Sequence, residues 1–152
     1  MTNDRDLITA ALSVMFISGC APEAITEAEA IAEASCTEAN SLCVELLVPA
    51  DYAGEASRLA TAFYDTADVN RLPDALVPEV LSPTVVAGEA YSLSHTELEV
   101  SGEYYVMFVL YDVDGGVWSP MEGVDLTAVT EQAAEFDGTP VNFGELTLAL
   151  AE

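Results

Sequence analysis

The feature that most constrains the fold is an apolar run from Tyr104 to Tyr111, which contains no charged residue and is rich in aromatic side chains and Val. A run of this composition is typical of a central β-strand that is buried on both of its faces. Turn-forming residues bound it, with Ser101 and Gly102 before it and Asp112 after it. The run therefore predicts the central strand of a sheet.

Shorter segments on either side also have strand patterns. Apolar residues alternate with other residues over positions 42–48, which predicts a half-buried strand. Residues 58–65 predict a second strand, with Leu59, Thr61 and Phe63 on one face. Further strands or strand pieces are predicted at 84–86, 91–100 and 141–150.

Two segments have mixed signals. The segment from Asp68 to Pro83 contains three prolines, so we expect a long connection with room for a short edge strand. The segment from Asp125 to Phe136 fits both a helical stripe and an alternating strand. We expect a strand in the second segment because its neighbours are strands.

Together these patterns predict an all-β fold. About six to eight short strands separated by turn signals favour a single antiparallel β-sandwich, with an open barrel as the alternative. We expect this domain to span residues 36–152.

The amino end has the pattern of an export signal. Residues 7–17 form an apolar run that is shorter than the roughly 20 residues of a membrane-spanning helix. The sequence Ile17-Ser18-Gly19-Cys20 that follows resembles the lipobox of bacterial lipoproteins. The resemblance implies a signal peptide over residues 1–19 and attachment of lipid, including palmitate-type acyl chains, to Cys20. The alternative is an amphipathic or buried helix in which Cys20 is incidental.

The segment that follows Cys20 is rich in Ala and Glu. Residues 20–35 are predicted to tether the lipid to the domain, because like charges four residues apart weaken an isolated helix. In the Gram-negative sorting pattern, an Asp directly after the lipidated Cys retains a lipoprotein in the inner membrane. Here that position is Ala21, so for a Gram-negative source the resemblance implies the outer membrane.

The remaining cysteines form an even pair. Cys36 and Cys43 lie close together in the sequence, and an oxidising compartment would allow them to form a disulfide. Their spacing fits no common zinc motif, and no His lies near them.

The charge of the chain excludes two classes of function. The chain has 27 acidic residues, three Arg and no Lys, with a formal net charge of −24. Such a chain cannot neutralise phosphates, so we expect no nucleic-acid partner. Basic residues cannot hold it on anionic lipid either, so the predicted membrane contact is the covalent lipid.

A second resemblance covers about 50 residues around the central run. The segment Gly102–Gly115, followed by Pro120, Gly123 and Asp125, resembles prealbumin-like or immunoglobulin-like β-sandwich modules of exported bacterial proteins. The resemblance implies a sandwich fold and a surface-module role, but no activity.

The loop after the central run is a candidate metal site. Asp112 and Asp114 offer hard oxygen ligands, and Glu122 or Asp125 would complete a shell for Ca²⁺. The EF-hand pattern fails, because Gly116 stands where it has an oxygen ligand. The alternative is an ordinary acidic turn without a cofactor.

No motif points to catalysis. His95 is the single histidine, and the sequence around it offers no nucleophile or oxyanion site, so we expect a structural or surface role. Trp118, in the same loop as the acidic residues, is either a ligand-binding aromatic or a cap on the core. We therefore expect a non-catalytic, lipid-anchored cell-envelope protein with a binding or structural role. The alternatives are an exported hydrolase that uses carboxylates and a Ca²⁺-dependent adhesion module.

Overall fold

The computed structural model describes residues 36–116 and 119–152. These residues contain nine strands and no helix, which confirms the all-β prediction. The strands are β1 (Leu42–Leu47), β2 (Glu55–Tyr64), β3 (Ala75–Val86), β4 (Ala90–His95), β5 (Gly102–Asp112), β6 (Leu126–Val129), β7 (Ala134–Phe136), β8 (Val141–Thr147) and β9 (Ala149–Leu150). The predicted signal peptide, Cys20, the tether and Trp118 lie outside the described residues.

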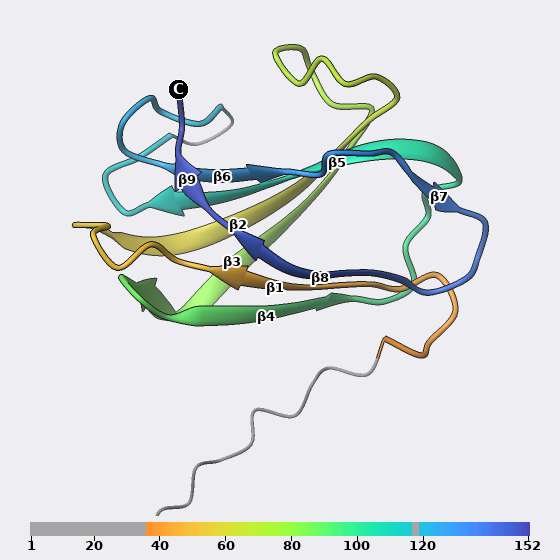
Figure 1. Ribbon diagram of the computed structural model, residues 1–152, viewed down its shortest axis with the longest axis horizontal. Helices are drawn as coiled ribbons and strands as arrows, with labels where there is room; N and C mark the ends of the chain where they lie inside the picture. Colours follow the sequence, from red (N-terminus) through yellow and green to blue (C-terminus); the bar gives the residue numbers. More distant parts are fainter. Residues whose placement is uncertain (1–35, 117–118) are drawn as a thin grey trace, which may run out of the picture. The chain divides into compact units, whose positions relative to one another are not determined.

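The strands form two sheets that pack together as a β-sandwich (Figure 1). One sheet has the order β4-β1-β8, and the other has the order β3-β2-β5-β6-β9, with β7 paired to β5. The predicted antiparallel arrangement holds for every strand pair in the described residues except β1 and β8, which are parallel.

The main core lies between the two sheets. Phe63 of β2 packs edge-to-face against Phe136 of β7, with 5.4 Å between ring centroids, and both side chains are buried. Burying a side chain of this size stabilises the fold by about 1.5–3 kcal/mol. Other fully buried members of this core are Leu42, Leu46, Leu59, Leu93, Val106, Phe108, Leu110, Leu126 and Leu148.

The predicted central strand is confirmed. β5 lies between β2 and β6 and is buried from Val106 to Asp112. Its side chains alternate between two apolar clusters. Phe108 and its neighbours two residues away face the other sheet, whereas Met107, Val109 and Tyr111 form a second cluster with residues of β2.

The segment before β4 differs from its prediction. Instead of a long connection with a short edge strand, residues 75–86 form a strand of 12 residues, β3. It contains Pro78 and Pro83 and lies at the edge of the larger sheet, where it pairs only with β2 in the described residues. An edge strand tolerates proline because the N–H groups on its free side form no hydrogen bonds with a neighbouring strand.

The last predicted strand is in fact two strands in different sheets. β8 pairs with β1, whereas β9 pairs with β6 of the larger sheet. Leu148 lies between them, is buried, and donates its N–H to the carbonyl of Leu47 over 3.0 Å. The chain therefore crosses from one sheet to the other at this residue. The ambiguous segment 125–136 contains β6 and β7, as the strand interpretation predicts.

Candidate functional site

The larger sheet has a second apolar face, on the side away from the smaller sheet. We call it the outer face. Its centre consists of Ala60, Ala62, Tyr64, Met107, Val109 and Tyr111, all of them buried. The strand register places Ala62 beside Met107 and Ala60 beside Val109. The apolar run in β5 thus serves two clusters, one on each side of the sheet.

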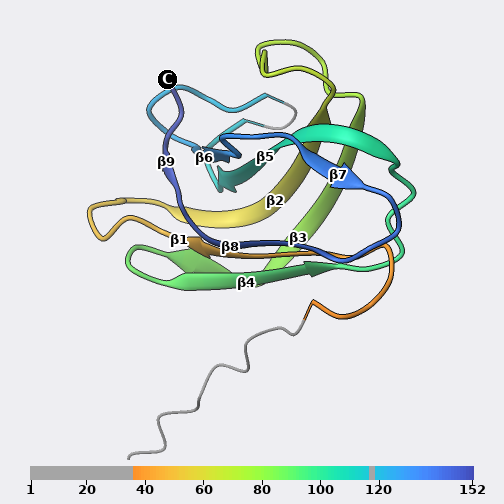
Figure 2. The same ribbon diagram turned by 45° about the vertical axis from the view of Figure 1, so that its right-hand side comes forward.

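A groove of about 850 Å³ lies on this outer face. Its floor consists of side chains of β2 and β5, including Ala62, Tyr64 and Val109. The connection between β2 and β3 lines one part of it, and residues near the chain end line another. In Figures 1 and 2 this connection (yellow-green) and the C-terminus both lie on the side of the larger sheet away from β1 and β4. Ligand pockets in proteins commonly measure about 300–1,000 Å³. The lining residues outside the floor are Val69, Asn70, Arg71, Leu72, Pro73, Leu76, Ser119, Pro120, Ala151 and Glu152.

Exposed apolar side chains border the groove. Leu72 is 89% exposed and Leu76 is 37% exposed, and both line the groove. Val80 of β3 and Val129 of β6 are also exposed, and their register partners are Arg58 and Met107. Exposed apolar side chains that gather on one face are typical of an interaction site.

Both arginines of residues 36–152 lie on or beside this face. Arg58 lies over the ring of Tyr111, 5.6 Å from its centroid, and donates a hydrogen bond to the carbonyl of Gly116 over 2.9 Å. Arg71 forms ion pairs with Asp65 at 3.0 Å and with Asp74 at 2.8 Å. Each guanidinium group therefore already has partners.

The groove tyrosines are uncharged at neutral pH. Burial raises the pKa of Tyr64, and the nearby Arg71 opposes this only in part. Burial also raises the pKa of Tyr111. Both hydroxyl groups therefore stay protonated.

The acidic loop after β5 is organised around two buried carboxylates. Asp125 accepts hydrogen bonds from the N–H groups of Asp112 at 2.8 Å, Gly116 at 2.8 Å and Met121 at 2.6 Å. Asp112 in turn accepts hydrogen bonds from the hydroxyl of Tyr52 and from the N–H groups of Glu55 and Asp114. Burial of Asp112 opposes its ionisation, but the hydrogen bonds outweigh burial and lower its pKa.

This arrangement differs from the predicted calcium loop. Asp114 and Glu122 are exposed, while Asp112 and Asp125 are buried and use their oxygens as acceptors for N–H and O–H groups. In the part of the chain that the structure describes, no group of three or more His, Cys, Asp or Glu side chains could hold a metal ion. The two buried carboxylates instead hold the loop that presents Ser119 and Pro120 to the groove.

Two glycines beside the buried carboxylates have a steric role. A Cβ atom at Gly115 would collide with the carboxylate of Asp125, and one at Gly54 would collide with the carboxylate of Asp112. Where the backbone approaches a buried carboxylate this closely, only glycine leaves enough space. The Asp-rich, Gly-rich sequence is therefore explained by hydrogen bonding within the loop.

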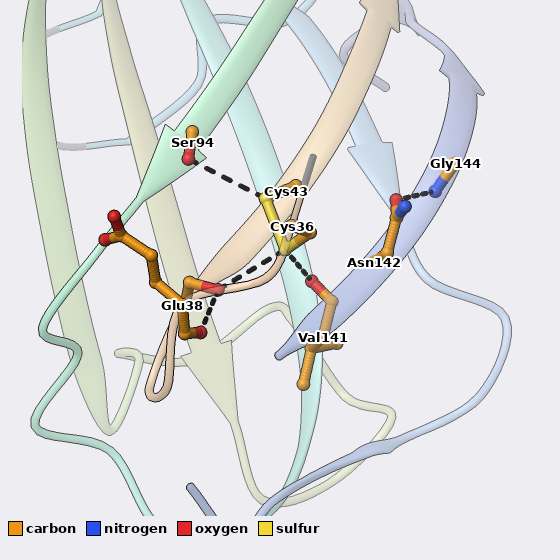
Figure 3. Close-up of a disulfide and its surroundings, with 8 residues drawn as sticks. Cys36, Glu38, Cys43, Ser94, Val141, Asn142 and Gly144 are labelled. Carbon is orange, nitrogen blue, oxygen red and sulfur yellow. Dashed lines mark hydrogen bonds between the residues drawn. A yellow bond between two sulfur atoms is a disulfide. The ribbon is translucent and has the colours of Figure 1, made fainter. Parts of the chain in front are cut away.

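The predicted cysteine pair is found. Cys36 and Cys43 are joined by a disulfide, with their Cα atoms 5.7 Å apart. Figure 3 shows the bridge between Ser94 of β4 and Val141 of β8, and the sulfur of Cys36 lies 3.3 Å from the carbonyl oxygen of Val141. The bridge thus holds the start of the domain against the beginning of β1 and β8, away from the groove residues.

His95 lies between the two sheets. Its Nε2 is 2.9 Å from the hydroxyl of Thr61, which joins β4 to β2. Burial lowers the pKa of His95, and the charge of Glu79 opposes this shift. This contact between the two sheets gives His95 a structural role in the sandwich.

The groove is not predicted by the sequence pattern. Its floor lies in the predicted strands 58–65 and 104–111, and part of its lining lies in the segment 68–83, where the sequence predicts a long connection with room for a short edge strand. The detectable signal was the pair of apolar residues Val69 and Leu72 within a polar connection, next to Tyr64 at the end of a strand.

The described residues contain no helix that is long and apolar enough to cross a membrane. Comparisons of this chain with known protein families, with curated proteins and with solved structures find no match.

Proposed function

We propose that this chain is a lipid-anchored cell-envelope protein whose β-sandwich binds a ligand in the groove on its outer face. The observation that carries the binding role is the groove itself, with an apolar and aromatic floor that includes Tyr64, Met107 and Tyr111. Such floors with a few polar groups at the rim are typical of ligand sites.

The anchoring part of the proposal rests on the sequence. Ile17-Ser18-Gly19-Cys20 supports lipidation of Cys20, and Ala21 supports the outer membrane for a Gram-negative source. A protein held by several acyl chains stays at the membrane without further contacts. The sandwich is then free to bind a ligand near the membrane surface.

Binding is favoured over carboxylate-dependent hydrolysis. Hydrolysis of the glycosidase kind needs two carboxyl groups facing one substrate. Among the described residues, Glu152 is the one acidic side chain that lines the groove. The carboxylates of Asp112 and Asp125 already accept hydrogen bonds from N–H groups of the loop and of β2 and from the hydroxyl of Tyr52.

The test uses an uncharged fluorescent dye, N-phenyl-1-naphthylamine, with the full-length chain carrying Cys20→Ala, which removes the site of lipid attachment. We expect saturable binding that Leu76→Ser weakens about three- to tenfold, because a groove contact is lost. Val86→Ser is the matched control, since Val86 is on the same strand and is 36% exposed, close to the 37% of Leu76, but does not line the groove. Equal affinities of the two variants would show that the dye binds elsewhere on the chain.

A further inference from the structure

We propose that the ligand of this groove is an uncharged, elongated apolar chain, such as the hydrocarbon part of a lipid. This inference rests on the proposed binding function and adds the chemical class of the ligand. It is argued from the shape of the groove and from the charges around it.

The lining of the groove comes from several neighbouring strands. Its lining begins at Leu76 on β3, continues over β2 and β5, and reaches Ala151 just beyond β9. These strands are neighbours in the order β3-β2-β5-β6-β9. With strands about 4.8 Å apart, the lining extends over roughly 19 Å. A path of this length suits a chain-like ligand better than a compact one.

The face beneath the ligand carries no acid. In the described strands, the outer-face positions 58–64 of β2, 76–80 of β3 and 105–111 of β5 hold no carboxylate. This is notable in a chain with 27 acidic residues. These positions are Arg58, Ala60, Ala62, Tyr64, Leu76, Pro78, Val80, Tyr105, Met107, Val109 and Tyr111.

The two arginines that border the groove already have partners. Arg71 contacts the carboxylates of both Asp65 and Asp74 through its Nη2 atom. Arg58 uses its Nη2 atom for the carbonyl of Gly116 and stacks on Tyr111. An anionic ligand would have to break one of these pairings or lose its hydration without a partner, which is costly. A cationic ligand would meet two guanidinium groups in or beside the lining and a single carboxylate among the described lining residues, that of Glu152. The groove therefore complements an uncharged ligand.

A second copy of the chain fits this face less well. The net charge of −24 makes two copies repel each other, and the groove is a hollow lined by side chains from the β2–β3 connection and the chain end. We therefore treat self-association as an outcome that the experiment must be able to detect.

The experiment compares three ligands with the same chain and different head groups. Decanol, decylamine and decanoate compete with N-phenyl-1-naphthylamine for the full-length Cys20→Ala protein at pH 7. We expect decanol to displace the dye at a concentration at least about tenfold lower than either charged ligand. Its potency should not fall when NaCl is added, because no ion pair is involved.

A charge variant tests why the groove prefers an uncharged ligand. Asp65→Asn with Asp74→Asn leaves Arg71 without its ion-pair partners, so we expect decanoate to gain several-fold in potency. Glu135→Gln with Glu145→Gln removes the same charge from exposed positions outside the groove lining and should leave the ranking unchanged. Melting temperatures of both variants check that the fold is intact.

The other results would overturn the inference in distinguishable ways. Strongest displacement by decylamine, weakened by NaCl, would assign a cationic ligand, and strongest displacement by decanoate would assign an anionic one. A dimer in sedimentation that excludes the dye would assign the face to a second copy. If neither the dye nor any of the three ligands binds, the proposed binding function itself is wrong.

Discussion

The N–H of Asp112 donates a hydrogen bond to Oδ1 of Asp125 over 2.8 Å and so joins the end of β5 to the residue before β6. The second oxygen of Asp125 accepts from Gly116 and Met121 on the intervening loop. One buried carboxylate therefore determines the path of the loop that lines part of the groove.

This network predicts a large effect of Asp125→Asn. The amide turns an N–H₂ group toward backbone N–H donors, so at least one hydrogen bond is lost in a buried place. We expect the free energy of unfolding to fall by about 3 kcal/mol, measured by urea denaturation. Asp114→Asn, at an exposed position of the same loop, should change it by no more than about 0.5 kcal/mol. Similar losses in both variants would contradict the central role of Asp125.

Calcium should have no specific effect on the domain. The oxygens of Asp112 and Asp125 already accept hydrogen bonds from the protein, and a cation would have to displace these donors. We expect millimolar CaCl₂ to raise the melting temperature no more than NaCl at equal ionic strength. A rise that NaCl does not reproduce, and that Asp112→Asn with Asp114→Asn abolishes, would restore the calcium-dependent adhesion hypothesis.

His95 should make stability depend on pH. Because burial holds its pKa below the ordinary value of 6.5, the unfolded chain takes up a proton at a higher pH than the folded chain. The free energy of unfolding should therefore fall as the pH falls below about 6.5. His95→Gln should flatten this part of the profile, measured by urea denaturation between pH 7.5 and 5. Parallel profiles for both proteins would show that other groups cause the slope.

The disulfide should stabilise the domain. Closing the short ring between Cys36 and Cys43 removes unfolded-chain entropy worth about 2.5 kcal/mol on the loop model. The double variant Cys36→Ser with Cys43→Ser should lose stability of this order in urea denaturation. In exported wild-type protein, both cysteines should resist alkylation until a reductant is added. Labelling without reductant would argue against both the bridge and an oxidising compartment.

Lipid attachment predicts where the protein is found. Changing Cys20→Ala should move the protein out of the membrane fraction or leave its precursor uncleaved, because the acyl chains have no other attachment site. Cell fractionation and the mass of the mature chain measure this. The variant with Cys36→Ser and Cys43→Ser serves as the control and should stay in the membrane fraction. If Cys20→Ala changes neither location nor processing, the lipoprotein proposal is wrong.

The sequence by itself determined the all-β class, the central strand, and the pairing of the two cysteines. These depend on local signals: the uncharged run from Tyr104 to Tyr111, the alternation around Leu59, and the short spacing of Cys36 and Cys43. Each of these signals depends only on the local sequence. It indicates which residues of a segment are buried, or which cysteines can pair, independently of the neighbouring strands.

Only the tertiary structure decided which partners these segments meet. β3 is a long strand in spite of its prolines because it lies at a sheet edge, and the last segment divides at Leu148 because its two halves pair with different sheets. The groove arises in the same way, since Tyr64, Met107 and Ala151 are far apart in sequence and line one hollow only when β2, β5 and the chain end come together. Periodicity specifies that a side chain is buried, but the neighbour that buries it is specified by strand order.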